Sequence, residues 1–118
     1  MFEKNLSISL LLDFYGDILS QRQNDMIDMY YNEDCSLAEI AETFSISRQG
    51  VRSVLKKGET ILIDMENKLH LAARFIKVRD KSSEIATELQ AINKSISNGE
   101  ITSRIDLLIK QIKDMADY

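Results

Sequence analysis

The sequence predicts an all-α protein, in which a helix-turn-helix bundle of sigma-factor type is followed by long C-terminal amphipathic helices. Apolar residues recur at steps of three and four nearly everywhere along the 118 residues, with little strict alternation. Proline, which breaks helix interiors, is absent. Serine side chains stand where helix N-caps are expected. We expect residues 1–58 to form the helix-turn-helix domain and residues 59–118 a helical extension that serves packing or dimerisation.

Three helices are predicted before the turn of the motif. The first spans about Leu6 to Ile18, and its inner side is formed by Leu10, Leu11, Phe14 and Ile18. Ser20 and Gln23 make a capping box that opens a second helix, which ends near Tyr31. Ser36 and Glu39 make another capping box, which opens a third helix ending near Phe44. The aromatic side chains Phe14, Tyr15, Tyr30 and Tyr31 are expected in the core between the first two helices, and the alternative is a platform that stacks RNA bases.

The segment from Leu37 to Lys56 satisfies the spacing of a helix-turn-helix. Ser47 is a good N-cap for a fourth helix that starts at Arg48. Apolar and small positions are expected to form the contact between the third and fourth helices, namely Ile40, Ala41, Phe44, Ile46, Val51, Val54 and Leu55. Turns of this type often contain glycine, and here Ser45 stands at that position.

The second half carries three-four stripes of apolar residues. The stripes are Leu62, Met65, Leu69, Ala72 and Ile76, then Ile85, Leu89, Ile92 and Ile96, then Ile101, Ile105, Leu108, Ile112 and Met115. Asn98-Gly99 is a strong turn signal between the last two. Such stripes need an apolar partner, so the helices are expected to form either an antiparallel hairpin or a homodimer.

The outer face of the fourth helix indicates a nucleic-acid ligand. It carries Arg48, Gln49, Arg52, Ser53, Lys56 and Lys57, with no acidic residue between Arg48 and Lys57. In DNA-binding versions of the motif this helix enters the major groove. Arg48 and Gln49 suit guanine and adenine edges, and Arg52, Lys56 and Lys57 suit phosphates. The formal net charge of −4 opposes this hypothesis, because an acidic chain is repelled by nucleic acid at long range.

Composition argues against several other classes. No apolar run is long enough for a membrane span, and the start lacks the plan of a signal peptide, so we expect a cytoplasmic protein. Cys35 is the only cysteine and lies among acids, which disfavour a reactive thiol. His70, the only histidine, has no second metal ligand at a suitable spacing and is expected on a helix surface. We therefore expect no enzyme activity, no metal and no cofactor.

Four sequence blocks resemble the YlxM-type helix-turn-helix proteins of bacteria. They are Leu11 to Tyr15, Tyr30-Tyr31, Ser36 to Glu42 and Ser47 to Val51. The resemblance covers roughly residues 10–71. The same segment is also similar to the promoter-reading C-terminal region of bacterial sigma factors, which uses a helix-turn-helix. Arg52-Ser53 departs from the family's commoner tyrosine-aspartate pair and makes the helix more basic.

The resemblance implies a role in protein targeting to the membrane. Genes of the family tend to sit beside those for the signal recognition particle GTPase and its receptor. One hypothesis is a regulatory protein that binds DNA or signal recognition particle RNA through the basic helix. The alternative is an interaction adaptor that binds the targeting GTPase and dimerises through its C-terminal helices. The acidic net charge favours the second hypothesis and the basic helix favours the first.

Overall fold

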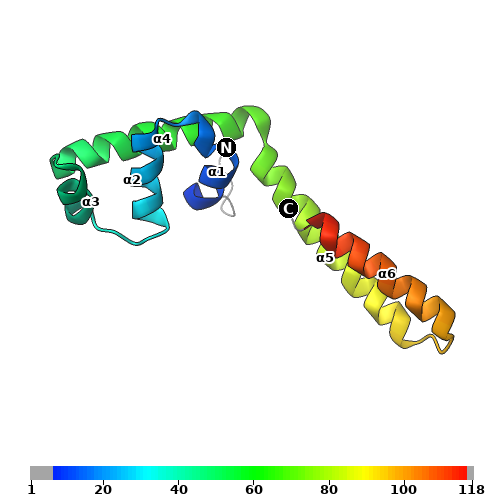
Figure 1. Ribbon diagram of the computed structural model, residues 1–118. Helices are drawn as coiled ribbons and strands as arrows, with labels where there is room; N and C mark the ends of the chain where they lie inside the picture. The colour runs from blue at the N-terminus through cyan, green and yellow to red at the C-terminus, as the bar shows by residue number, and fades with distance from the viewer. Residues whose placement is uncertain (1–6, 117–118) are drawn as a thin grey trace. The chain divides into compact units, whose positions relative to one another are not determined.

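The computed structural model describes residues 7–116, and within them the chain is helical (Figure 1). Those residues contain six α-helices, one 3-10 turn and no strand, which confirms the all-α prediction. In chain order the elements are α1 (Ile8–Tyr15), η1 (Gly16–Ile18), α2 (Gln21–Tyr31), α3 (Leu37–Phe44), α4 (Arg48–Leu69), α5 (Leu71–Lys94) and α6 (Gly99–Ala116). Leu6, the expected start of the first helix, lies outside the described residues.

The chain divides into two compact units, Met1–Ala73 and Arg74–Tyr118. The boundary predicted near Gly58 falls inside α4, which continues without interruption to Leu69. The first unit extends further along the chain because Leu62 and Glu66, on later turns of α4, are still buried in its core. The functional division into a helix-turn-helix domain and a helical extension stays a prediction.

Serine caps set the helix starts of the first unit, as the sequence predicts. The Ser20 hydroxyl accepts from the amide of Gln23 at 3.2 Å, and the Gln23 side chain accepts from the Ser20 amide at 3.0 Å. Ser36 and Glu39 make the same reciprocal pair at 3.1 and 2.9 Å. Each box satisfies two donors that a helix N-terminus would otherwise leave without partners.

In the first unit, α1, α2 and α3 lie along one side of the long helix α4 (Figure 1). The core residues come from all four helices, and the fully buried side chains include Leu11, Met26, Ile27, Ile40, Val51 and Leu62. Gly58 allows α2 to approach α4 closely, because a Cβ there would lie 2.5 Å from Cδ1 of Ile27. The core therefore sits between α4 and the three shorter helices.

The predicted inner side of the first helix is only partly correct. Leu11 is buried, but Ile18 is 51% exposed and Leu12 and Tyr15 are buried instead. The α-helix ends at Tyr15 and continues as the tighter 3-10 turn, which has three residues per turn and changes the direction of later side chains. The 3-10 turn accounts for the exposure of Ile18, whereas Leu12 and Tyr15 lie within α1 itself, on a buried face that the predicted inner side did not include.

The prediction that all four aromatic residues lie in the core is wrong for three of them. Tyr15 is buried, whereas Phe14, Tyr30 and Tyr31 are each more than a third exposed. The two tyrosine rings meet edge to face at 5.0 Å on the last turn of α2. Tyr30 and Tyr31 follow the buried Met26 and Ile27 by four residues and so share their helix face, but they lie on the last turn of α2, where both side chains stay partly exposed.

A buried carboxylate organises the junction between α4 and α5. Glu66, only 2% exposed, accepts from the Tyr15 hydroxyl at 2.6 Å and from the amides of Ala72 and Ala73 at 3.0 Å each. The Tyr15 oxygen in turn accepts from the Leu71 amide at 3.2 Å. Burial and the hydrogen bond to Glu66 raise the pKa of Tyr15. These partners cap the first amides of α5, which have no carbonyl within their own helix.

The apolar stripe predicted from Leu62 to Ile76 is therefore interrupted. His70 adopts a left-handed conformation with φ 56°, so one helix ends at Leu69 and the next starts at Leu71. Leu69 is consequently exposed, whereas Leu62 and Ala72 are buried. The sequence predicted His70 on a helix surface. That prediction is wrong, because His70 lies at the junction between two helices.

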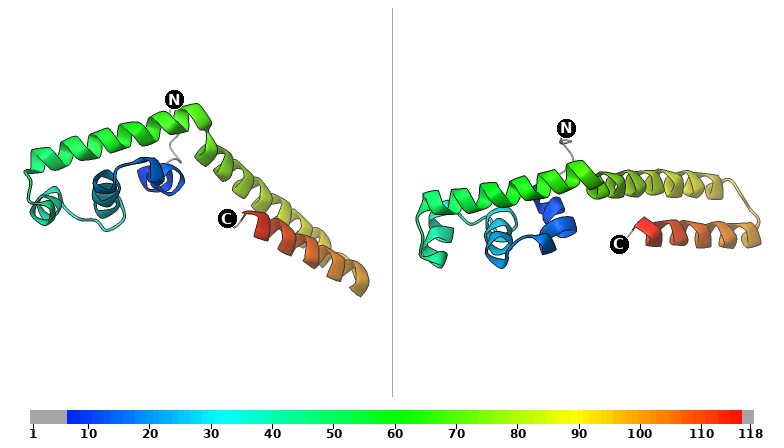
Figure 2. Two further views of the ribbon diagram at one scale, coloured as in Figure 1. Left: turned by 45° about the horizontal axis from the view of Figure 1, so that its top comes forward. Right: turned by 90° about the horizontal axis from the view of Figure 1, so that it is seen from above.

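In the second unit, α5 and α6 run side by side in opposite directions (Figures 1 and 2). The side chain of Asn98 caps α6 by accepting from the amides of Glu100 and Ile101 at 2.9 and 3.3 Å, which confirms a chain reversal at Asn98-Gly99. Asn93 donates to Asp106 across the hairpin at 3.0 Å. No helix within residues 7–116 is both long and apolar enough to cross a membrane.

Candidate nucleic-acid interface

The turn between α3 and α4 is closed by its own backbone. Ser45 adopts the left-handed conformation with φ 56° and ψ 45°, and the Ile46 amide donates to the Ala41 carbonyl at 3.1 Å. Ser47 then caps α4 by accepting from the Gly50 amide at 3.0 Å. Serine thus holds the left-handed position at which glycine is usual. The turn predicted at residues 45–47 is confirmed.

The two faces of α4 differ as the spacing predicts. Ile40 and Ala41 of α3 are buried together with Val51 and Leu55 of α4, which makes the apolar contact of the motif. Every residue proposed to bind nucleic acid is exposed on the other face, namely Arg48, Gln49, Arg52, Ser53, Lys56 and Lys57. We call these six residues the basic face.

The cations of the basic face have no acidic partner within the part of the chain that the structure describes. The three ion pairs found there join Lys68 to Asp64, Arg79 to Asp80 and Lys81 to Glu84. Arg48, Arg52, Lys56 and Lys57 therefore concentrate four positive charges on the first three turns of α4. A phosphate backbone could bind there without breaking an internal ion pair.

Two shallow grooves flank the basic face. One is lined by Gln23, Ser53, Lys56, Lys57, Thr60 and Ile61. The other is lined by Tyr30, Tyr31, Leu37, Arg52, Leu55, Lys56 and Glu59. Lys56 borders both, so the basic face continues into a groove on each side. The spacing predicts the basic residues correctly as exposed. The tyrosines beside them are predicted in the core, which is wrong. The signal that could have shown their exposure is the position of the Tyr-Tyr pair directly before a polar loop.

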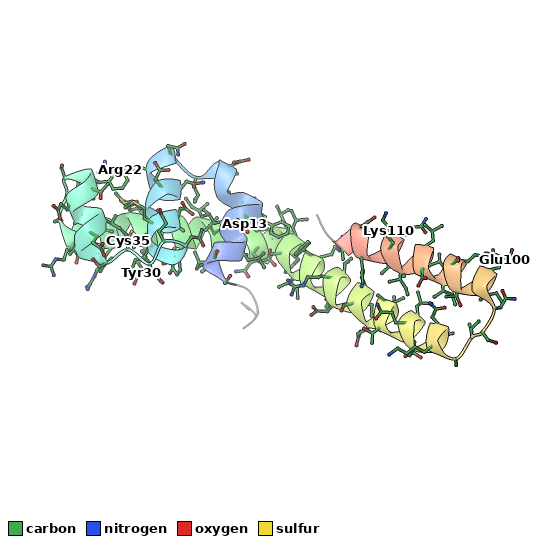
Figure 3. The ribbon with its side chains drawn as sticks, turned by 60° about the horizontal axis from the view of Figure 1, so that its bottom comes forward. Asp13, Arg22, Tyr30, Cys35, Glu100 and Lys110 are labelled. Atoms are coloured by element: carbon green, nitrogen blue, oxygen red, sulfur yellow. The ribbon has the colours of Figure 1, made fainter. Side chains whose placement is uncertain are left out.

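Other reactive or charged side chains lie elsewhere in the first unit. Arg22 of α2, labelled in Figure 3, places its guanidinium carbon 5.9 Å from the centroid of the Phe44 ring and so links α2 to α3. Desolvation and the acids Glu33, Glu39 and Asp34 raise the pKa of the Cys35 thiol, in the direction expected from its neighbours. No cluster of metal-ligating side chains is found within residues 7–116.

Two helices crossed over an apolar contact, a short capped turn and an exposed second-helix face define a helix-turn-helix protein. Residues 2–114 match the family described as "Putative helix-turn-helix protein, YlxM / p13 like". The chain belongs to this family. The match extends beyond residues 10–71, where the sequence motifs carry the resemblance, and includes most of the C-terminal hairpin.

Relatives in several bacteria share most of the chain. A UPF0122 protein of Acetivibrio thermocellus is 39% identical over 113 residues, which cover 93% of this chain and 97% of the relative. A UPF0122 protein of Limosilactobacillus reuteri is 48% identical over 82 residues, covering 70% and 72%. One from Halalkalibacterium halodurans is 38% identical over 109 residues, covering 92% and 96%. Two of these relatives are thus similar to the chain over more than nine-tenths of its length.

Proposed function

We propose that the protein is a regulatory nucleic-acid-binding protein that uses the basic face of α4 and acts in the signal recognition particle pathway. The observation that carries the proposal is the cluster of four exposed cations without ion-pair partners among the described residues. A local concentration of positive charge attracts phosphates even when the net charge of the whole chain is −4, because salt screens charges more than about 10 Å away.

The six residues would divide the contacts between bases and backbone. Arg48 and Gln49 stand on the first turn of α4, the end of a recognition helix that reaches base edges. Arg52, Lys56 and Lys57 follow at helical spacing and suit phosphates. Ser53 lies between them and can donate to either a base edge or a phosphate. The role of each side chain follows from its place along the helix.

The ligand is duplex DNA or the RNA of the signal recognition particle. The sigma-factor likeness of the motif supports DNA. The resemblance to YlxM-type proteins, whose genes tend to sit beside those of the targeting GTPase and its receptor, supports the RNA. Binding of that RNA would place the protein next to the targeting GTPase.

Fluorescence anisotropy with labelled duplex DNA and labelled signal recognition particle RNA tests the proposal. We expect wild-type binding that weakens steeply as salt rises, because bound cations release counterions from the phosphates. Arg48→Ala/Arg52→Ala should lose most of the affinity. Arg74→Ala/Arg104→Ala is the matched control, since it removes two exposed arginines from the hairpin instead. Equal loss in both variants, or no binding by the folded wild type, would contradict the proposal.

A second candidate function is supported by the surface of the C-terminal hairpin. Exposed apolar residues recur every seven positions along each helix, at Val78, Ile85 and Ile92 of α5 and at Ile101, Leu108 and Met115 of α6, and each is 44–73% exposed. A repeat of seven keeps side chains on one line along a helix and is typical of helices that pack against a partner.

The seam, the interface between α5 and α6, buries few of the apolar side chains of the hairpin, so the seven-residue repeat just described forms an exposed apolar line. Ala86 and Ile109 are buried, and one pocket beside Ala86 is lined largely by polar or small side chains, among them Ser82, Ser83 and Gln90. The hairpin thus leaves much of its apolar surface outside its own interface. A second copy of the chain, or the signal recognition particle GTPase, would cover that surface, which supports the adaptor alternative.

Sedimentation velocity tests the homodimer. We expect the wild type to sediment as a dimer and Ile85→Asp/Leu108→Asp to sediment as a folded monomer, because buried charges without partners oppose association. Ala91→Asp/Ser103→Asp adds the same two charges at exposed positions off the apolar line and should remain a dimer. A monomeric wild type would rule out self-association and leave the GTPase as the partner to test.

A further inference from the structure

A groove lined by Tyr30, Tyr31, Arg52, Lys56 and Glu59 borders the basic face, and its tyrosines take no part in the contacts assigned above. We call it the tyrosine groove. It runs between the last turn of α2 and the middle of α4. All five residues belong to the compact unit Met1–Ala73, so the groove is built within one body.

The two tyrosine rings present an aromatic surface of fixed geometry. Tyr30 and Tyr31 are 37% and 38% exposed, and their rings meet at an interplanar angle of 83°. The Tyr31 hydroxyl donates to the Glu59 carboxylate across the groove, which anchors that ring against α4. Tyr30 packs edge to face on the anchored ring and remains open to solvent at the end of α2 (Figure 3).

Two cations of the basic face border the same groove. Arg52 and Lys56 are exposed and have no ion-pair partner among residues 7–116. One carboxylate, Glu59, also lines the groove and accepts from the Tyr31 hydroxyl, so the cations at the groove outnumber its anion two to one. The groove therefore combines an exposed ring with two cations, as sites that bind single-stranded nucleic acid do.

We propose that the tyrosine groove stacks an unpaired base of a single-stranded nucleic acid whose phosphates lie on Arg52 and Lys56. This inference rests on the proposed nucleic-acid function and names the class of ligand. A base within a duplex has both faces covered by its neighbours, whereas an unpaired base has a free face for an aromatic ring. Stacking tolerates any base, so the groove adds affinity for loops and single strands without reading their sequence.

The test compares a labelled oligoadenylate RNA with a duplex of the same length, using the full-length protein and anisotropy. We expect Tyr30→Ala to weaken binding of the single strand roughly 5- to 150-fold, the range that loss of one stacked base gives. Duplex binding should stay unchanged. Tyr30→Phe keeps the ring and should bind as the wild type does, which separates stacking from any role of the hydroxyl.

The remaining variants separate this inference from the proposed function. Arg48→Ala should weaken duplex and single strand alike, because it lies on the basic face but does not line the groove. If Arg48→Ala lowers affinity while Tyr30→Ala leaves single-strand binding unchanged, the groove is not a base site and the basic face still binds. If the folded wild type binds neither probe, both proposals fail. Circular dichroism confirms that each variant is folded.

Discussion

The two units of the chain differ in how their polar groups are hydrogen-bonded and in how much of their apolar surface is buried. In the first unit, buried Glu66 has three donors within 3.0 Å, and the core draws on four helices. In the hairpin, only a few apolar side chains such as Ala86 and Ile109 are buried, and a line of larger apolar side chains is exposed. The first unit has a core built from all four of its helices, whereas the hairpin exposes apolar side chains of the kind that helices in a bundle bury against one another. The comparison supports the proposals that the basic face lies on a well-packed unit and that the hairpin binds a partner.

The largest expected effect is at the buried carboxylate. Glu66→Ala removes the acceptor of the Tyr15 hydroxyl and of two amides of α5, so it should lower the free energy of unfolding by about 3 kcal/mol. Glu84→Ala in the hairpin breaks an exposed pair with Lys81 and should cost less than about 0.5 kcal/mol. Urea unfolding measures both, and equal losses would remove the contrast between the units.

The next effect is at the close approach of α2 and α4. Gly58→Ala places a methyl group against the fully buried Ile27 side chain and should cost about 1–2 kcal/mol, despite alanine's better helix propensity. Ile27→Val removes the clashing Cδ1 atom, so the double variant should lose less stability than the two single losses added together. Strict additivity in urea unfolding would show that the two positions are not in contact.

A stabilising effect is expected at the turn of the motif. Ser45 holds a left-handed conformation, so Ser45→Gly should raise the free energy of unfolding by about 0.5–1 kcal/mol. Glycine relieves the strain of the left-handed backbone, and its greater loss of conformational entropy on folding offsets part of that gain. Ser97→Gly, before α6 of the hairpin, has no left-handed backbone to relieve and should give no gain. Thermal unfolding that ranks Ser97→Gly above Ser45→Gly would contradict this account.

The smallest effect is a pH dependence at the second capping box. The Ser36 amide and hydroxyl hold the pKa of Glu39 below its usual value of about 4.3. Because the folded-state pKa is lowered, Glu39 stabilises the fold above pH 4–5, and this contribution is lost as the pH falls through the folded pKa. Carboxyl carbon NMR should show the Glu39 titration move upward in Ser36→Ala. An unmoved titration would show that the Ser36 hydroxyl does not contribute to the shift.

The elements that could be predicted from the sequence are those set by short-range chemistry. Serine caps fixed the starts of α2, α3 and α4, and the i, i+3, i+4 spacing placed the basic face opposite Val51 and Leu55. Both features depend on residues within a few positions of one another. They need no knowledge of the tertiary contacts.

The features that were missed depend on contacts distant in sequence. The break at His70 is made by Glu66 and Tyr15, and Tyr15 is 51 residues away from Glu66. The exposure of Tyr30 and Tyr31 follows from the packing of α2 against α4, which Gly58 permits. Apolar spacing alone could not distinguish an aromatic residue in the core from one beside the basic face. The candidate site was therefore predicted as a charged helix without its groove.

The salt dependence of binding tests the central claim, that the basic face binds phosphates, most directly. The logarithm of the association constant falls linearly with the logarithm of salt concentration, by about 0.7–0.9 for each phosphate contact. We predict that Lys56→Ala/Lys57→Ala lowers this slope by about 1.4–1.8 relative to wild type, while Lys110→Ala/Lys113→Ala on α6 leaves it unchanged. A slope that is unchanged by the α4 variant, or lowered equally by both, would contradict the account.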